Sequence, residues 1–247
     1  MAHVEWHKPT YNVGEEPLVV EEEGAIQFAN GKYIIRTEEE AIKQLKSQQM
    51  VAIFQNDSEI GPRALGNRSL MFDPTNPDAK NIVNEIKERE PYRPFAGSML
   101  LEYFEDYFET ESLKESPYMS YAITVKIDKV DEISSIVHHD YTCRIQTVTE
   151  EQNKNYYSLI KAWHKETECP VIFNTSFNLG GEAMVESLED AIDTCKRSMI
   201  NFIYLPEDQD QWEHMLPENG EWEEEQEEEP FNASKDSTTV DTAFINK

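Results

Sequence analysis

The sequence is poor in basic residues and has no long apolar run. Its 247 residues include 22 lysines and arginines against 49 aspartates and glutamates, a formal net charge of −27. Such an acidic excess repels phosphate backbones wherever it is not locally reversed, which argues against non-specific nucleic-acid binding. No apolar run approaches the roughly 20 residues that a membrane helix needs, and the N-terminus lacks a basic-then-apolar signal pattern. We therefore expect a cytoplasmic protein that binds neither nucleic acid nor a membrane.

Cysteine is scarce as well, with three residues and no CxxC or Cys/His spacing. This pattern argues against a disulfide framework and a structural zinc site, and it favours a reducing, intracellular setting. Cys143 is expected to be a packing residue, because the sequence places no histidine to activate it. The six histidines form no HxH or HExxH pattern, so no metal-ligating residues are predicted.

Composition divides the chain into three parts. Residues 207–247 hold 14 acidic and 2 basic residues, which predicts a solvated, disordered tail. Residues 1–32 mix proline, glycine and acidic residues with weak strand signals, and we treat them as an N-terminal extension. Residues 33–206 remain as the predicted folded domain.

Within that domain, helix and strand patterns alternate. Predicted helices cover Thr37 to Gln48, which opens with a Thr37/Glu40 capping box, the segment from Asp78 through Ile86, Asn155 to Lys165 and Ser187 to Ser198. Predicted strands cover Met50 to Phe54, Phe95 to Leu101, Tyr118 to Ile127, Arg144 to Val148, Val171 to Asn174 and Ile200 to Leu205. The alternation predicts a layered α/β or α+β domain.

The stretch SEIGPRALGNRS at 58–69 follows a predicted strand. Gly61 and Gly66 allow the backbone to turn sharply, and Arg63 and Arg68 can each present a fork of N–H donors to phosphate or carboxylate oxygens. The same composition is also typical of a structural turn with surface arginines. Both interpretations stay open at this point.

A second stretch, IKEREPYRPFA at 86–96, gathers Lys87, Arg89 and Arg93 at a helix end. Clustered bases in so acidic a chain favour an anion site. The alternative is contact with the helix C-terminus and exposed ion pairs with Glu88 and Glu90, worth about 0.3–1 kcal/mol each.

Two further stretches place polar residues on strands. In TCRIQTV, at 142–148, Arg144 shares a strand face with Gln146, and it anchors a ligand only if that face meets a cleft. In PVIFNTSFNLGGE, at 170–182, a buried strand ends in Asn174, Ser176 and Asn178, where α/β sheets usually bind ligands. An Asx or ST turn that closes the strand is the alternative for each of these residues.

Together, the four stretches resemble, in order and spacing, the C-terminal domain of the O-carbamoyltransferases that modify nodulation factors, cephamycins and tobramycin. The resemblance covers about Thr37 to Leu205. It implies a YrdC-like twisted mixed sheet flanked by helices around a basic cleft, in which carbamoyl phosphate and ATP, with Mg²⁺, give carbamoyl adenylate. It also implies a Kae1-like partner domain that passes the carbamoyl group to a hydroxyl.

Carried over by position, the resemblance implies catalytic roles for Lys87, Arg144 and Ser176. Binding of ATP and carbamoyl phosphate is implied for Arg63, Arg68, Arg93, Asn174 and Asn178, with Arg68 and Asn174 equally compatible with a buried structural role. The sequence departs from the family pattern at Gly97, where proline is common, and at Tyr141, where glycine is common. The second change affects a loop next to Arg144.

Two other functions compete with the carbamoyl-activating one. A YrdC-type synthase that makes threonylcarbamoyl adenylate for transfer RNA modification would need a basic surface, which the acidic balance disfavours. A module that binds nucleotide or carbamoyl phosphate without catalysis is the second, and the retained arginine set argues against it.

Overall fold

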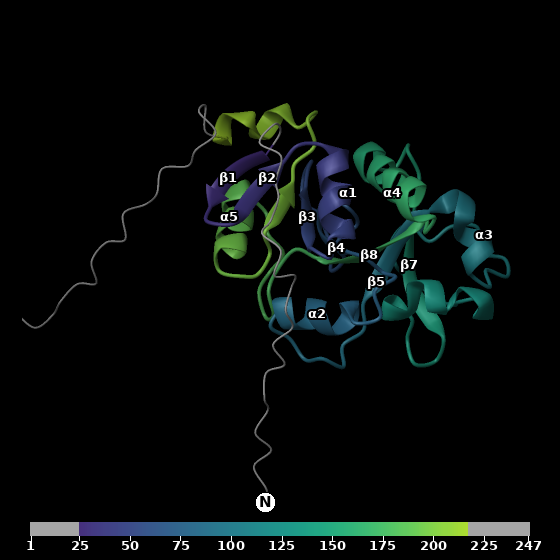
Figure 1. Cartoon of the computed structure of the whole chain (residues 1–247). Coiled ribbons are helices and arrows are strands. Elements are labelled where there is room, and N and C mark those ends of the chain that lie inside the picture. Colours follow the sequence, from purple (N-terminus) through teal and green to yellow (C-terminus); the bar gives the residue numbers. More distant parts are fainter. Residues whose placement is uncertain (1–24, 217–247) are drawn as a thin grey trace, which may run out of the picture.

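The computed structural model describes residues 25–216, apart from the side chains of Asp210 and Glu213. These residues form one nine-stranded mixed sheet in the order β1-β2-β9-β3-β4-β8-β5-β7-β6, with helices on both faces (Figure 1). Parallel pairing joins β2 to β9, β9 to β3 and β5 to β7, and the other neighbours are antiparallel. The predicted combination of helices with a mixed sheet is confirmed.

The strands are β1 (Ala25–Ala29), β2 (Lys32–Ile35), β3 (Val51–Phe54), β4 (Arg68–Phe72), β5 (Ala96–Leu100), β6 (Ala122–Thr124), β7 (Thr142–Val148), β8 (Val171–Ser176) and β9 (Phe202–Tyr204). The α-helices are α1 (Glu38–Lys46), α2 (Ala79–Ile86), α3 (Phe104–Tyr107), α4 (Lys154–Thr167) and α5 (Leu188–Lys196). Short 3₁₀ helices are η1 (Leu101–Tyr103), η2 (Ile127–Lys129), η3 (Asp131–Ile136) and η4 (Asp210–Met215).

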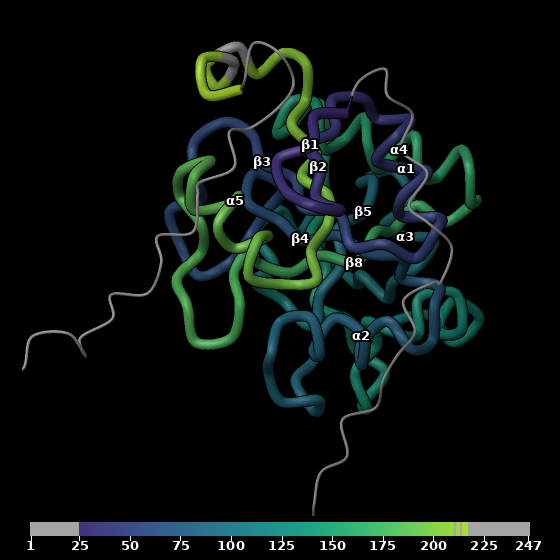
Figure 2. Tube along the Cα trace, turned by 60° about the vertical axis from the view of Figure 1, so that its left-hand side comes forward, coloured from purple at the N-terminus to yellow at the C-terminus, as the bar shows by residue number. Residues whose placement is uncertain are grey.

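Each face of the sheet carries its own apolar core. Along β3, Val51 and Ile53 pack with α1 and α4, whereas Ala52 and Phe54 pack with α2 and α5. Figure 2 shows the strands lying between α5 on one side and α1 with α4 on the other. Successive side chains of a strand point to opposite faces, so a strand covered on both sides is apolar throughout. This explains why the run from Met50 to Phe54 contains no polar residue.

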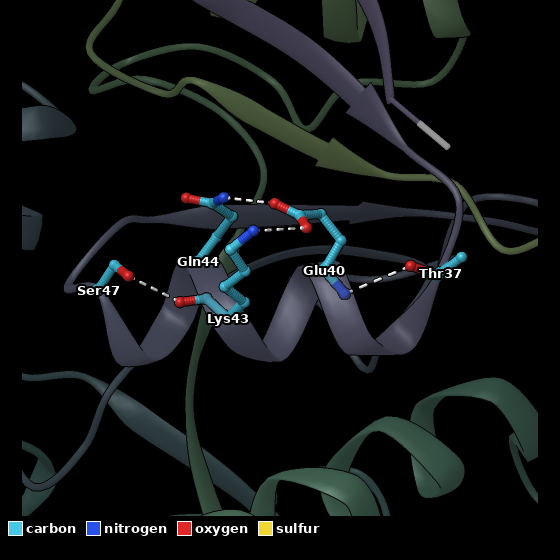
Figure 3. Close-up of polar contacts among 5 residues, drawn as sticks. All are labelled: Thr37, Glu40, Lys43, Gln44 and Ser47. Carbon is cyan, nitrogen blue, oxygen red and sulfur yellow. Dashed lines mark hydrogen bonds and ion pairs between the residues drawn. The ribbon is translucent and has the colours of Figure 1, made fainter. Parts of the chain in front are cut away.

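Local capping signals correctly predicted two helix starts. Of the predicted Thr37/Glu40 capping box the Thr37 half forms, since Thr37 Oγ1 accepts the backbone N–H of Glu40 at 3.3 Å (Figure 3). The Glu40 carboxylate instead accepts from Gln44 Nε2 and lies 3.4 Å from Lys43 Nζ. Ser187 and Asp190 form a complete capping box at the start of α5. Helix α2 begins after Asp78 as predicted, but the Asp78 side chain makes no capping bond because its backbone is already helical, with φ −91° and ψ −4°.

Three strand predictions need correction. The segment from Tyr118 to Ile127 forms a strand only at β6, since Met119 has a φ of 52°, which extended backbone does not allow. Strand β4 was not predicted, although its residues are buried between β3 and β8. Strand β1, inside the predicted extension, and β2, which follows it, were not predicted either, and the two pair with each other.

The ordered domain therefore extends beyond residues 33–206 at both ends. Beyond Leu205, Trp212 of η4 packs edge-on against Phe54, with ring centroids 5.1 Å apart. The predicted disorder of the tail from residue 217 onward lies outside the described residues. Within 25–216, no helix combines the length and the apolar character that crossing a membrane requires.

Strand register sets polar residues side by side at one edge of the sheet. Ala96, at the start of β5, lies opposite Arg144 of β7 and opposite Asn174 of β8. Ser176 ends β8 and lies opposite Ser69 of β4. Residues far apart in the sequence thus meet where β8 ends and β5 begins.

Candidate functional site

A cleft of about 610 Å³ opens at this edge of the sheet. Seven of the eight residues predicted for the site line it: Arg63, Lys87, Arg93, Arg144, Asn174, Ser176 and Asn178. They come from the loop between β3 and β4, the end of α2, the segment before β5, strand β7 and the end of β8. The four separate sequence stretches therefore converge on one place, and we name this hollow the cation cleft.

The basic side chains lie close enough to influence one another. Partial desolvation and the nearby Arg144 guanidinium lower the pKa of Arg63. Burial, followed by the charge of Arg93, lowers the pKa of Arg89 to about 10. Like charges disfavour each other's ionised forms, so the cluster is repulsive without an anion and is relieved when one binds.

Lys87 is the most deeply buried of these cations, with 2% of its side chain exposed. Its Nζ donates to the backbone oxygens of Ser176 and Asn178, the latter at 2.7 Å, and to Asn178 Oδ1 at 2.9 Å. Burial, followed by the charges of Arg89 and Arg93, lowers its pKa to about 7. Lys87 therefore fixes the Ser176–Asn178 turn and contributes its charge from beneath the cleft floor.

Arg68 is the predicted residue that the structure does not bring into the cleft. Its guanidinium donates to backbone oxygens of Gln55, Asn56, Asn67 and Glu186 and stacks 3.7 Å from the centroid of the Phe54 ring. It is 1% exposed. The second arginine of the loop is therefore a structural cross-link, and the prediction that it binds ATP is replaced by this role.

Asn174 connects the cleft wall to the arginine loop. Its Nδ2 donates to Ala64 O at 3.1 Å and to Ser98 Oγ at 2.8 Å, while Gln146 Nε2 donates to Leu65 O at 2.9 Å. These bonds hold the two residues that directly follow Arg63, which helps to position its side chain at the cleft.

Two buried polar atoms of the cleft wall have no hydrogen-bond partner among the described residues. They are Nε of Arg144 and Oδ1 of Asn174. An unpaired buried polar atom costs about 1–3 kcal/mol. One donor and one acceptor are therefore left over in a wall that is otherwise well bonded.

The turn after β8 closes the cleft floor tightly. Ser176 Oγ donates to Asn178 Oδ1 at 2.7 Å, and Asn178 Nδ2 donates to Glu182 O at 2.7 Å. Gly180 N donates to Lys87 O at 2.7 Å, and a Cβ at Gly180 would lie 2.8 Å from Glu88 O. Only glycine permits this approach between the turn and the end of α2.

The cleft is also lined by residues that were not predicted for the site, among them Arg89, His138, Thr175 and Gly180. Arg89 stood among the clustered bases, but its stacking on Phe95, 4.1 Å from the ring centroid, depends on the tertiary fold. In the sequence, the pair Gly180-Gly181 indicated a tight turn after β8. No local signal points to His138, which begins the tight turn to Thr142.

The two departures from the family pattern are readily accommodated. Tyr141 has a φ of 62° and sits in the turn after His138, so this tyrosine adopts the left-handed conformation that glycine favours. Gly97 is buried in β5, where a Cβ would lie 2.6 Å from Ile136 Cδ1.

Charge in the cation cleft is opposite to that of the whole chain. Five cations line it (Arg63, Lys87, Arg89, Arg93 and Arg144), whereas its one lining carboxylate, Glu182, lies 3.0 Å from Arg197 Nη1. The described residues contain no group of three histidine, cysteine or acidic side chains placed to hold a metal ion. Cys143 is buried, and burial raises its pKa to about 12, which agrees with a packing role. The cleft is built to receive anions.

Comparison with known proteins identifies the family. The family model described as Carbamoyltransferase C-terminus matches residues 42–208. The chain is 42% identical to the nodulation protein NolO of Bradyrhizobium diazoefficiens over 142 residues, which are 57% of this chain and 26% of that protein. It is 34% identical to the 3'-hydroxymethylcephem-O-carbamoyltransferase of Amycolatopsis lactamdurans over 157 residues, 64% of this chain and 29% of that protein. The chain thus spans about a quarter of the length of these relatives.

Among solved structures, Sua5 of P. abyssi, determined in complex with L-threonine, has a TM-score of 0.50 at 15% identity. The match covers 69% of this chain and 48% of that one, and it confirms the predicted YrdC-like fold. Full-length HypF, in its phosphate- and nucleotide-bound form, aligns with a TM-score of 0.47 at 22% identity, over 66% of this chain and 20% of that one. The family model covers most of the described domain, including every residue of the cation cleft, and the chain therefore belongs to the carbamoyltransferase C-terminus family.

Proposed function

We propose that the cation cleft converts carbamoyl phosphate and ATP into carbamoyl adenylate for transfer to a hydroxyl acceptor. The convergence of Arg63, Arg89, Arg93 and Arg144 above the buried Lys87 is the observation that carries this proposal. Both substrates are polyanions, and the reaction must hold them against their mutual repulsion. Positioning and charge stabilisation are the contributions that such a cleft makes.

The reaction balances with one water molecule. Water cleaves the phosphate from carbamoyl phosphate to leave carbamate, and a carbamate oxygen then attacks the α-phosphorus of ATP and expels pyrophosphate. One phosphate and one pyrophosphate are released for each carbamoyl adenylate. The negative charge that develops on the leaving pyrophosphate is what the arginines would stabilise.

Each cleft residue has a defined part in this proposal. Arg63 and Arg144, at the open side, would bind phosphate oxygens in the forked geometry that guanidinium groups provide. Ser176 and Asn178, held in place by Lys87, would orient the carbamoyl group or the nucleotide. The unpartnered Asn174 Oδ1 is a hydrogen-bond acceptor, and it suits the NH₂ donor of a carbamoyl group. A phosphate group has no N–H to donate to it.

Mg²⁺ would accompany ATP and be held chiefly by phosphate oxygens. Phosphate oxygens are among the hard oxygen ligands that Mg²⁺ prefers. The ion supplies charge neutralisation on the triphosphate when bound. The hydroxyl acceptor would be brought by a Kae1-like domain, in accordance with relatives that are about four times as long as the matched region.

Phosphate and pyrophosphate release by the 247-residue chain tests the proposal. With ATP, Mg²⁺ and carbamoyl phosphate, the wild type should release both in equal amounts, and omission of carbamoyl phosphate should abolish pyrophosphate release. Arg144→Ala should lower the rate at least about tenfold, whereas Lys154→Ala, outside the cleft, should not. Pyrophosphate release that does not depend on carbamoyl phosphate, or that survives Arg144→Ala, would contradict the proposal.

A further inference from the structure

The loop that carries Arg63, residues 55–67, packs little of its outer part against the core. From Asn56 to Arg63 every residue is exposed or half-buried, and these eight residues contain no helix or strand. Burial of apolar surface therefore contributes little to fixing the Arg63 guanidinium. The hydrogen bonds at the base of the loop must do so, and part of them comes from outside the cation cleft.

A cluster of side-chain amides holds the base of this loop. Gln55 is fully buried, and its Nε2 donates to Gly66 O at 2.7 Å and to Asn153 Oδ1 at 3.1 Å. Its Oε1 accepts from Asn155 Nδ2 at 3.0 Å. Asn153 Nδ2 in turn donates to Asn67 Oδ1 at 3.0 Å. Both ends of the loop are thus bonded to the start of α4.

The segment after β9 adds a second support. Asn155 Nδ2 also donates to Asp208 Oδ1 at 2.7 Å, and Gln209 Nε2 donates to the same oxygen at 3.0 Å. Gln209 Oε1 accepts the backbone N–H of Asn56 at 2.7 Å. Residues 208 and 209 belong to the predicted tail, yet they complete a ring of hydrogen bonds at the start of the loop. We name the four amide side chains of Gln55, Asn153, Asn155 and Gln209 the amide brace.

Helix α4 also contacts the backbone of the loop directly. Gly66 has a φ of 108°, and a Cβ at this position would lie 2.3 Å from Cδ1 of the fully buried Tyr156. Only glycine permits both this backbone angle and this close approach. Helix α4 therefore sets the position of the loop by packing as well as by hydrogen bonds.

We propose that the amide brace positions Arg63 for the anion that binds in the cation cleft, with Asn155 as its central positioning residue. None of the four amides lines the cleft, so they act on a ligand only through the loop. The inference rests on the proposed function, because it takes that anion to be a phosphate group of the substrates. A misplacement of about 1 Å can remove much of what a positioned group contributes. The cation cleft remains the site at which the anion binds.

A double-mutant cycle tests the inference, with inorganic tripolyphosphate as the probe and calorimetric titration as the measurement. Arg63→Ala should weaken tripolyphosphate binding about tenfold. Asn155→Ala should weaken it about fivefold in the wild-type background, but by less than about twofold when residue 63 is already alanine. Gln209→Ala, which removes the acceptor of the Asn56 N–H, should repeat this pattern. An amide that only stabilises the fold would change the affinity by the same factor in both backgrounds.

The matched control is Asn76→Ala. Asn76 is half-buried like Asn155, and its side chain also makes two hydrogen bonds. Its Nδ2 donates to Gln48 Oε1 at 2.6 Å, and its Oδ1 accepts the backbone N–H of Asp78 at 2.8 Å. Neither partner belongs to the Arg63 loop, so the affinity for tripolyphosphate should stay within about twofold of the wild type.

The outcomes distinguish this inference from the proposed function. If Arg63→Ala weakens binding but Asn155→Ala and Gln209→Ala do not, the positioning role is overturned while the proposed function stands. Equal losses from the two amide variants in both backgrounds, or an equal loss in Asn76→Ala, would also overturn it. A wild type that does not bind tripolyphosphate, or that binds it no better than Arg63→Ala, would contradict both the positioning role and the part that the proposed function gives to Arg63.

Discussion

Two hollows of the described domain differ in size and in the charge of the side chains that line them. A pocket of about 1020 Å³, here named the helix pocket, lies along α1 and α4 and exceeds the cation cleft of about 610 Å³. The helix pocket is lined by as many acids as bases: Arg36, Lys43, Lys46, Lys154 and Lys165 with Glu38, Glu39, Glu166, Glu207 and Asp208. The cation cleft has five bases and one acid. In a chain of charge −27, local reversal of charge identifies the ligand site better than volume does.

Ion pairing is the reason why we expect the helix pocket to attract anions less strongly than the cation cleft does. In the helix pocket, Lys46 Nζ lies 2.9 Å from Glu166 and Lys43 lies 3.4 Å from Glu40, so positive charge is already compensated (Figure 3). In the cation cleft, partial desolvation and then the nearby Arg144 lower the pKa of Arg63. Among the described residues, the one ion pair of its five bases joins Arg93 to Glu90 at 3.6 Å. Four tests examine this contrast, from the largest expected effect to the smallest.

Arg68 and Arg63 come from the same Gly/Arg stretch, and we expect the first to stabilise the fold and the second to bind the ligand. Arg68→Met keeps an unbranched side chain but leaves the backbone oxygens of Asn56 and Glu186 without their donors. It should lower the free energy of unfolding by about 3–5 kcal/mol. Arg63→Met, at an exposed position, should change it by less than about 0.5 kcal/mol. Urea unfolding measures both. Equal effects of the two substitutions would show that burial does not separate their roles.

Binding of an anion should depend on the cation cleft alone. Arg144→Ala removes forked charge-assisted hydrogen bonds, and it should weaken ATP binding about 10- to 100-fold. Lys154→Ala removes a base from the helix pocket and should leave the affinity within twofold. Calorimetric titration at fixed salt provides the measurement. A larger loss in Lys154→Ala than in Arg144→Ala would reverse the assignment of the two hollows.

Lys87 should make the stability of the ligand-free protein depend on pH. Its folded-state pKa of about 7 lies below its unfolded value of about 10.4, so between these values the folded state binds fewer protons. The free energy of unfolding should therefore rise with pH, by about 1–2 kcal/mol between pH 7 and 8.5. Well below pH 7 the curve should flatten, because both states are then protonated and the penalty for burying the ammonium is constant.

The matched variant for this pH effect is Lys87→Gln, which has no titrating group at that position. Urea unfolding of the variant should show no comparable rise over the same pH interval. If the free energy of unfolding of the wild type stayed flat or fell between pH 7 and 8.5, relative to the variant, burial of the charged Lys87 would not destabilise the fold.

The smallest effect is expected for ion pairs of the helix pocket. Lys46→Ala breaks its pair with Glu166, in which both side chains are about half exposed, and it should change the free energy of unfolding by less than about 0.5 kcal/mol. ATP affinity should be unchanged. A loss of ATP binding in Lys46→Ala would mean that the helix pocket, too, receives anions.

Sequence patterns predicted those features that local physics determines. The helix starts at Thr37 and Ser187, the apolar run of β3 and seven of the residues that line the cleft were predicted. Strands β1, β2 and β4 were missed because their own patterns are weak, and the pairing of β2 with β9 and of β4 with β8 joins segments far apart in the chain. Arg68 shows the same limit, since only the fold decides which arginine of a Gly/Arg loop turns inward.

The convergence of the cleft could be predicted only through the resemblance. Spacing alone left each stretch with a structural alternative, and the register that aligns Arg144, Ala96 and Asn174 across three strands is a long-range property.

Direct detection of carbamoyl adenylate is the measurement closest to the central claim. The wild-type chain, mixed with ATP, Mg²⁺ and carbamoyl phosphate and quenched within seconds, should yield carbamoyl adenylate by mass spectrometry, and Arg144→Ala should yield at least about tenfold less. Tight ATP binding without any carbamoyl adenylate in the wild type would contradict the account and leave the cation cleft as a binding site.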